Sequence, residues 1–336
     1  MEDEKKLLSD PKRPYKIYGH LEKGYEPVLE RFIGLFDEGI EKNSQLCVYV
    51  KDQKVIDIWG ETPGFPDKKF TYSPDSITMM FSNGKTVASV MMAILVDKGL
   101  LDYNEKVATY WPEFAQNGKE NITVADVLKH EGQLEQLEKP IDPDTNQTEN
   151  IKKNAQGEII EKQAAHPLPH GAKRVYHSIS RDCITNEIFR RVEPEGRTMG
   201  EYFQQVILPE FGIDIHLRMD PETFPKIAKF RDIGFFGSIR NSWKDRDHQY
   251  STVGFCGLCS YMSYFNTCVK EQNKTLGQGN RGYTEPETTG NSYDMEAFQN
   301  EKWYTAEVIS AMSLGSGRGL AKLAAFMANK GKLGEQ

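Results

Sequence analysis

The chain has 336 residues, of which 38% are hydrophobic and 27% are charged, a composition typical of a globular protein with a sizeable core. Its formal net charge is −7 and it has no clear basic stripe, so nucleic acid is not expected as a partner. Five cysteines and a polar segment 1–16 without an apolar signal sequence favour a reducing compartment, and we expect a cytoplasmic protein without a membrane span.

Local patterns predict a helix followed by a hairpin near the start of the chain. Residues 1–18 are expected to be flexible, and apolar spacing predicts an amphipathic helix over 24–42. Residues 45–50 and 54–59 are strand-like and are joined by a tight turn. In the second strand, the alternation places Val55, Asp57 and Trp59 on one side and Ile56 and Ile58 on the other.

The central part of the chain is predicted to be mainly helical. A helix that begins near Ser82 and ends at Gly99 is apolar on most sides, so we expect it to be buried. A second helix is expected over residues 122–129, with Thr123 as its N-cap. Further helices are predicted over 178–192, over 199–206 and within 306–329. The polar segments near 135–170 and 240–300 are interpreted as long insertions, which are usually functional lids or mobile loops.

Motifs that could bind metals or nucleotides are weak. Cys256 and Cys259 form a lone CxxC pair, for which packed thiols are favoured over a metal or redox site. The GxGxxG match at 277–282 follows no predicted strand, and the prolines between His166 and His170 prevent a shared helical metal site. We therefore expect no metal and no cofactor.

The strongest chemical signal is Ser82-Asn83-Gly84-Lys85, which fits the pattern S-x-x-K. Residues three apart lie on the same helix face, so the Lys85 side chain can reach the Ser82 hydroxyl and take its proton. The start of a helix also favours developing negative charge. The alternative is an N-cap serine beside a solvated lysine. The apolar helix that follows favours a buried Lys85 instead, and a buried lysine requires a reason.

Three segments together resemble the serine β-lactamase-related, penicillin-binding-protein-like family, in its class C-like esterase branch. They are Phe81-Ser82-Asn83-Gly84-Lys85-Thr86, Lys98-Gly99-Leu100-Leu101-Asp102 and the run from Ile122 to His130. The resemblance implies an α/β (α+β) fold of the β-lactamase/transpeptidase type, in which an antiparallel sheet domain carries an inserted helical subdomain. The active site would lie in the cleft between the two parts.

The family's second motif, Y-x-N, is matched best by Tyr176-His177-Ser178. The resemblance implies that Tyr176 shares a proton network with Ser82 and Lys85. Ser178 would support the site in place of the usual amide, since a hydroxyl can also donate and accept. The alternative for Tyr176 is a core tyrosine, and packing is the favoured interpretation of His177.

The family's third motif, K-T-G or H-x-G, has no match in this sequence. It would follow the last predicted helix, so we expect that the chain is truncated and that the C-terminal strands are missing. The hairpin at 45–59 would then lack sheet neighbours. Within a β-lactamase-related domain over 19–336, the prediction assigns 19–80 to the sheet subdomain, 81–312 to the helical subdomain and 313–336 to the last helix.

The resemblance implies a serine hydrolase that forms an acyl-enzyme with Ser82, Lys85 and Tyr176 as catalytic residues. We expect a carboxylesterase or amidase acting on small-molecule esters or amides. The alternative is a non-catalytic homologue that binds ligands or acts as a scaffold, because the third motif is absent.

Overall fold

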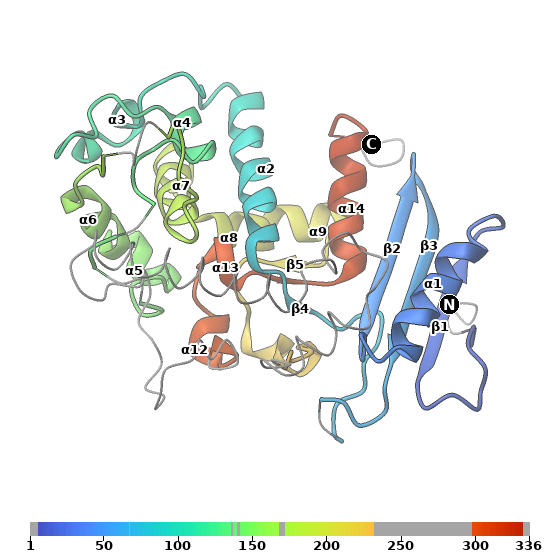
Figure 1. Cartoon of the computed structure of the whole chain (residues 1–336). Helices are drawn as coiled ribbons and strands as arrows, with labels where there is room; N and C mark the ends of the chain where they lie inside the picture. Colours follow the sequence, from blue (N-terminus) through green and yellow to red (C-terminus); the bar gives the residue numbers. More distant parts are fainter. Residues whose placement is uncertain are drawn as a thin grey trace.

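The structure is a computed structural model, and it describes residues 6–66, 68–135, 137–139, 142–167, 172–231 and 298–331. A small antiparallel sheet lies at one side, and a larger helical region built around α2 lies at the other (Figure 1). In chain order, the elements are β1 (Lys16–Leu21), α1 (Glu26–Asp37), β2 (Ser44–Val50), β3 (Gln53–Glu61), β4 (Thr78–Met79), η2 (Phe81–Asn83), α2 (Gly84–Asp97), α3 (Val107–Tyr110), η3 (Pro112–Phe114), α4 (Val124–Leu128), α5 (Thr148–Lys152), α6 (Ala155–Lys162), α7 (Ser180–Val192), α8 (Met199–Tyr202), η5 (Phe203–Ile207), α9 (Leu208–Phe211), β5 (Ile215–His216), η6 (Pro221–Lys226), α12 (Glu301–Tyr304), α13 (Ile309–Met312), β6 (Leu314–Gly315) and α14 (Gly317–Ala328).

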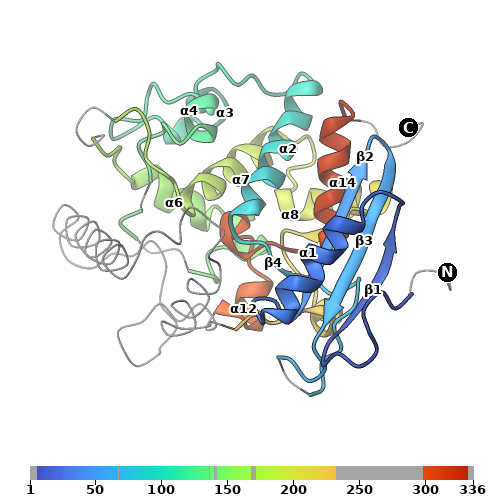
Figure 2. The same ribbon diagram turned by 45° about the vertical axis from the view of Figure 1, so that its right-hand side comes forward.

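The predicted hairpin is present as β2 and β3, and both of its faces are covered. Ile56 and Ile58 pack with Phe32 and Phe36 of α1 on one face. On the other face, the Asp57 carboxylate accepts a hydrogen bond from Arg318 of α14 at 3.0 Å. The two views place α1 and α14 on opposite sides of the sheet (Figures 1 and 2), as the alternation along β3 predicts.

Residues 16–21 form strand β1, so the predicted flexible segment 1–18 is wrong at its end. β1 pairs antiparallel with β3 from Lys16 opposite Glu61 to Leu21 opposite Ile56. Ile17 is fully buried in the core beneath α1, which explains why this segment is ordered. The sheet order is β1-β3-β2, so the expectation of a hairpin without sheet neighbours is also wrong.

The helix that begins near Ser82 is confirmed as a short 3₁₀ turn, η2, followed by α2. α2 contributes its apolar side chains to the largest core cluster. Its last residue is Asp97, and the chain turns away at Gly99, whose φ of +69° suits a residue without a β-carbon. Thr123 caps α4 as predicted, in a capping box with Asp126.

The later helices also match the predictions, with one extension. α7 and α14 occupy two of the predicted ranges. The helix predicted over 199–206 runs further, from α8 through the π-helical η5 into α9. It ends at Gly212, which has a φ of +57°.

The described part of the 135–170 insertion contains the helices α5 and α6, which contact the helical core. Lys119 is fully buried and donates to the Glu161 carbonyl at 3.0 Å. Trp111 donates to the Glu161 carboxylate at 2.8 Å, and Thr148 of α5 donates to buried Glu307 at 2.6 Å. These bonds fasten α5 and α6 to the helical core.

Several predictions concern residues outside the described ranges. These are most of the 240–300 insertion, the Cys256–Cys259 pair, the 277–282 glycine motif and His170. The division of the chain at residues 19, 81 and 313 stays a prediction. Among the described residues, no helix is long and apolar enough to cross a membrane.

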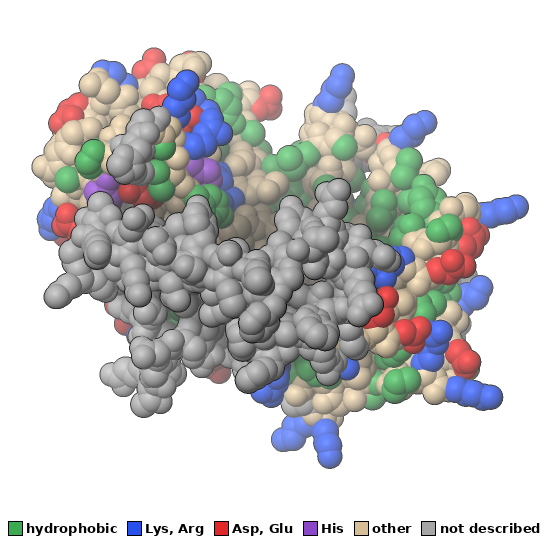
Figure 3. Space-filling view, in the orientation of Figure 1, with side chains coloured by type: hydrophobic (Ala, Val, Ile, Leu, Met, Phe, Trp, Pro, Cys, Tyr) green, Lys and Arg blue, Asp and Glu red, His purple; other side chains and the backbone are tan. Residues whose placement is uncertain are grey.

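A small sheet sets the starting point of α2. Its strand order is β4-β6-β5, and the Met80 amide just after β4 donates to the Ser313 carbonyl at 2.8 Å. The chain therefore enters η2 and α2 from a fixed position. Figure 3 shows a hollow between the two lobes, where α2, α9 and α14 enclose an apolar cavity of about 280 Å³. Lys98 lines this cavity and Ser82 does not.

Candidate active site

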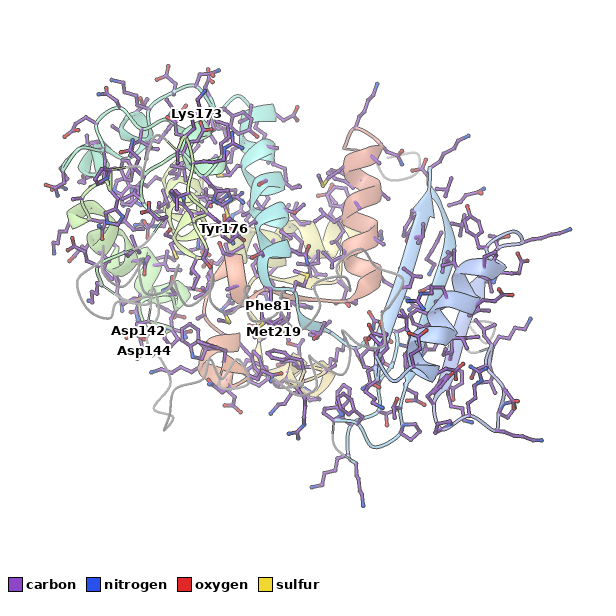
Figure 4. All side chains as sticks on the ribbon, in the orientation of Figure 1. Phe81, Asp142, Asp144, Lys173, Tyr176 and Met219 are labelled. Carbon is purple, nitrogen blue, oxygen red and sulfur yellow. The ribbon has the colours of Figure 1, made fainter. Side chains whose placement is uncertain are left out.

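Ser82 lies at the N-terminal end of α2, where Figure 4 shows the neighbouring side chains of Phe81 and Tyr176. Phe81 has a φ of +49°, which costs a non-glycine residue about 1–3 kcal/mol and is most common at functional sites. Its ring packs against Phe230 with 5.4 Å between centroids. The 3₁₀ turn η2 leads from the small sheet into α2, and Ser82 lies within this turn.

Two of the predicted site residues, Lys85 and Tyr176, converge on the hydroxyl oxygen of a third, Ser82. The Tyr176 hydroxyl lies 2.7 Å from Ser82 Oγ, within hydrogen-bond distance. Lys85 Nζ lies 3.4 Å from the same oxygen. The ammonium group also lies 4.8 Å from the centre of the Tyr176 ring. Residues 94 positions apart in the sequence thus form one proton network.

Lys85 is only 6% exposed, so the alternative of a solvated lysine is wrong. Its ammonium donates to the backbone carbonyls of Ser178 at 2.5 Å and Ser310 at 3.4 Å. Together with Ser82 Oγ, these are three acceptors for the three protons of an ammonium group. Lys85 Nζ is therefore held in place by two backbone carbonyls beside Ser82 Oγ.

Tyr176 is 54% exposed, so the alternative of a core tyrosine is wrong. Partial burial raises the pKa of its phenol, but the hydrogen bonds with Ser82 and Lys85 and the positive charge of Lys85 outweigh this effect. The net pKa of Tyr176 lies below its ordinary value. Lys85 thus favours the phenolate form beside the Ser82 hydroxyl.

Ser178 contributes to this arrangement through its backbone. Its carbonyl accepts from Lys85, while the residue is exposed at the surface. The neighbouring His177 is fully buried, and its Nε2 accepts from the Leu134 amide at 3.1 Å. The prediction that His177 serves in packing is confirmed.

His130 is a site neighbour that the sequence analysis did not single out. Its ring lies 4.8 Å from that of Tyr176, and its Nδ1 accepts from the His177 amide at 3.0 Å. Burial, together with the positive charges of Arg181 and other nearby groups, lowers the pKa of His130 to about 4. An uncharged imidazole therefore flanks the phenol. The position of His130 directly after α4 carries no pattern that would reveal this contact.

A second set of missed residues lies behind Lys85. Arg181 and Asp182 open α7 and are both buried, and Ser310 of α13 donates to Asp182 Oδ2 at 2.8 Å. Arg181 donates to the backbone carbonyl of Lys85 at 3.1 Å. Burial raises the pKa of Asp182, although Arg181 and Ser310 oppose the shift.

The start of α2 also supplies a region of positive potential. The first N–H groups of a helix have no acceptor within the helix, and the helix dipole adds to their effect. A negatively charged oxygen formed beside Ser82 would lie at this end. Gly84 permits the close packing here, because an added β-carbon would lie 1.9 Å from the Ile309 carbonyl oxygen.

No group of three or more side chains with metal-ligand chemistry occurs among the described residues. His166, one of the two histidines considered above, pairs with Glu135 at 3.2 Å. The hydrogen bond with Glu135 raises the pKa of His166. This histidine is therefore part of the polar packing around the insertion.

Comparisons with known proteins agree with this architecture. The esterase/beta-lactamase LipL of Mycobacterium tuberculosis is 30% identical over 215 residues, which are 62% of this chain and 47% of LipL. The chain therefore spans about half the length of this curated relative.

Two solved structures share the fold over most of the chain. A penicillin-binding protein homologue from Caulobacter crescentus superposes with a TM-score of 0.66 and 24% identity, over 95% of this chain and 73% of the homologue. A family VIII carboxylesterase gives a TM-score of 0.69 and 22% identity over the same shares of the two chains. The predicted β-lactamase/transpeptidase-like fold is confirmed.

The Beta-lactamase family matches residues 32–229, a range that contains Ser82, Lys85, Tyr176 and Ser178. This match covers more than half of the chain. The chain belongs to the Beta-lactamase family.

Proposed function

We propose that this protein is a serine hydrolase that forms an acyl-enzyme on Ser82. The observation that carries the proposal is the convergence of Tyr176 at 2.7 Å and Lys85 Nζ at 3.4 Å on Ser82 Oγ. A serine hydroxyl is a weak nucleophile until an adjacent base takes its proton. The phenolate form of Tyr176 is the base. Lys85 favours this form, because it lowers the pKa of Tyr176 below its ordinary value.

In the first step, Ser82 Oγ attacks the carbonyl carbon of the substrate while its proton passes to the Tyr176 oxygen. The carbonyl oxygen becomes negative and is stabilised at the N-terminal end of α2. When the intermediate collapses, the bond to the leaving group breaks. Tyr176 then returns the proton to the departing alcohol or amine, which leaves an ester on Ser82.

In the second step, water replaces the leaving group. Tyr176 takes a proton from the water molecule as the water oxygen attacks the acyl carbon. The bond to Ser82 Oγ then breaks, Tyr176 returns the proton to Ser82, and the carboxylic acid departs. The same phenol therefore acts as base and acid in turn.

The substrates we propose are esters or amides of small acyl groups. LipL, which is 30% identical to this chain over 215 residues, is described as an esterase/beta-lactamase. Around Ser82, the exposed Phe81 and Tyr176 offer aromatic surface to an acyl or aryl group. Such a surface suits compact uncharged substrates.

Fluorophosphonate labelling followed by peptide mass spectrometry tests the proposal directly. We expect a covalent adduct on Ser82 in the full chain and none in Ser82→Ala, with p-nitrophenyl ester turnover lost in parallel. Ser44→Ala, in strand β2, serves as a matched control that should label normally. Unchanged ester turnover in Ser82→Ala would contradict the proposal.

A non-catalytic binding role is the second candidate. It is favoured by Ser178, a hydroxyl where the family's second motif has an amide. Under this alternative, a folded chain would bind an ester reversibly, and the rate of its hydrolysis would equal that of Ser82→Ala. Calorimetry with a slowly hydrolysed ester, compared with product release, separates the two candidates.

A further inference from the structure

Behind the three side chains of the site lies a buried polar cluster that the proposed reaction does not use. It consists of Arg181, Asp182 and Ser310, and we call it the Asp182 cluster. Asp182 is fully buried, Ser310 is 1% exposed and Arg181 is 4% exposed. Burial of a carboxylate is costly unless it is paired and hydrogen-bonded, and apolar residues of similar volume often serve packing better. The cluster therefore calls for a role beyond filling space.

We propose that Asp182 is a positioning residue of the active site, which holds Lys85 beneath Ser82. The inference rests on the proposed function of Ser82, but it makes separate predictions. Among the contacts of Asp182, none is to Ser82. It acts through Ser310 and Arg181.

The positioning follows from a chain of contacts between α7, α13 and α2. Ser310 Oγ donates to Asp182 Oδ2 at 2.8 Å, and the carbonyl of the same Ser310 accepts from Lys85 Nζ at 3.4 Å. Ser310 Oγ also lies 3.2 Å from the carbonyl of Ile179, the residue that follows Ser178. Asp182 thereby fixes α13 against the start of α7, and these two elements supply both carbonyl acceptors of the Lys85 ammonium.

A second branch reaches the backbone of α2. Arg181 Nε lies 3.3 Å from Asp182 Oδ1, and its guanidinium donates to the Lys85 carbonyl and to Ser89. Ser89 Oγ itself donates to the same carbonyl at 2.8 Å. The first turn of α2 is thus held at the residue that carries the ammonium group. Loss of the carboxylate would release both branches together.

The position of Lys85 can be followed at Tyr176, because Lys85 Nζ lies 4.8 Å from the centre of the Tyr176 ring and lowers the pKa of this phenol. His130, the titratable group facing the phenol from beyond α4, is uncharged near neutral pH. Asp182 acts on the pKa of Tyr176 in the opposite direction to Lys85, so its removal changes two influences at once. Ser310→Ala keeps the carboxylate and removes only the contact that fixes α13. A displaced Lys85 should therefore raise the pKa of Tyr176 in Ser310→Ala.

Titration of Tyr176 tests the position of Lys85 without any need for catalysis. In protein labelled with ¹³Cζ-tyrosine, the Tyr176 resonance is assigned by its absence in Tyr176→Phe. We expect its titration midpoint to move to higher pH in Ser310→Ala. Asp97→Asn removes an exposed charge at the other end of α2 and should leave the midpoint unchanged. An unmoved midpoint in folded Ser310→Ala would overturn the proposal.

Labelling kinetics test the same role in two variants, with Ser310→Ala available in case Asp182→Asn folds poorly. Ser310→Ala keeps the Arg181–Asp182 pair. We expect fluorophosphonate labelling of Ser82 to slow on the order of 10- to 100-fold in both variants. Equal labelling rates in the parent and Ser310→Ala would overturn the positioning role.

The two proposals fail in different ways. If the parent chain does not label at all, the proposed hydrolase function fails, and the Tyr176 titration still decides whether Asp182 and Ser310 position Lys85. If the parent labels but neither variant differs from it in rate or midpoint, the hydrolase function stands and the Asp182 proposal fails.

Discussion

The two ends of α2 carry similar lysine–tyrosine pairs in different surroundings. At the start of the helix, Lys85 Nζ lies 4.8 Å from the Tyr176 ring centre. At the end, Lys98 Nζ lies 5.3 Å from the Tyr202 ring centre and donates to its hydroxyl at 2.8 Å. A charged amine over a tyrosine ring is therefore common to both ends.

The environment of each pair decides what it can do. Lys85 is buried and held by two carbonyls, and its tyrosine is exposed and directed at a serine hydroxyl. Lys98 is exposed, and its tyrosine is buried in the core. Tyr176 is 54% exposed, whereas Tyr202 is 4% exposed. The comparison indicates that a nucleophile and a fixed cation, not the pair alone, make a reactive site.

Replacing each of the two lysines by alanine should give the largest difference in labelling rate. We expect Lys85→Ala to slow labelling of Ser82 on the order of 100- to 10,000-fold, because the phenolate loses its stabilising cation. Lys98→Ala should label at the parent rate. The rates are measured with a fluorophosphonate under pseudo-first-order conditions, with the circular dichroism spectrum as a check on folding. Equal rates for the two variants would remove the distinction between the ends.

The matching tyrosine variants should differ somewhat less. Tyr176→Phe removes the group that takes the proton from Ser82, and we expect a loss of about 100-fold in ester turnover. Tyr202→Phe loses a hydrogen bond to an exposed lysine, which should cost about 1 kcal/mol of stability and leave turnover unaltered. Steady-state assays and urea melts of both proteins measure these effects. A larger loss of turnover in Tyr202→Phe would reverse our assignment.

Glycines near the two ends should differ in their effect on stability. Gly84→Ala places a β-carbon 1.9 Å from the Ile309 carbonyl oxygen, so α13 must shift and we expect a loss of about 3 kcal/mol. Gly99 has no atom within 4 Å of the added carbon, and only its φ of +69° opposes alanine. Gly99→Ala should cost about 1 kcal/mol. Similar urea midpoints for Gly84→Ala and Gly99→Ala would show that α13 can shift easily away from Gly84.

The dependence on pH is the mildest expected effect. Since the pKa of Tyr176 lies below its ordinary value of about 10, the phenolate forms at lower pH than in a free tyrosine. The labelling rate should rise about tenfold for each pH unit on the rising limb. It should level off above the titration midpoint of Tyr176, which lies below 10. Tyr176→Phe should lose this limb. A limb that persists in Tyr176→Phe would assign the proton transfer to another group.

Local pattern was sufficient for the elements whose burial follows a simple period. The long apolar run after Ser82 identifies α2, and the alternation along β3 assigns Asp57 and Ile58 to opposite faces. β1 escaped notice because Gly19 interrupts its short alternation. α5 and α6 are polar, and they are held by single bonds such as that from Trp111 to Glu161, which no periodicity reveals.

The site was predictable only in part for a related reason. Ser82 and Lys85 lie one helical turn apart, so their proximity is local, whereas Tyr176 was selected by family resemblance. Arg181 and Asp182 look like solvated residues in the sequence, yet the tertiary packing of α7 buries them. Their partner Ser310 lies 128 residues beyond Asp182, and no sequence pattern links the two.

Identification of the labelled peptide after fluorophosphonate treatment tests the central claim most directly. The account predicts that one peptide, containing Ser82, carries the adduct, and that labelling is faster in the parent than in Lys85→Ala. An adduct on another serine, or no adduct on a chain shown to be folded, would contradict the claim that the start of α2 is a reactive site.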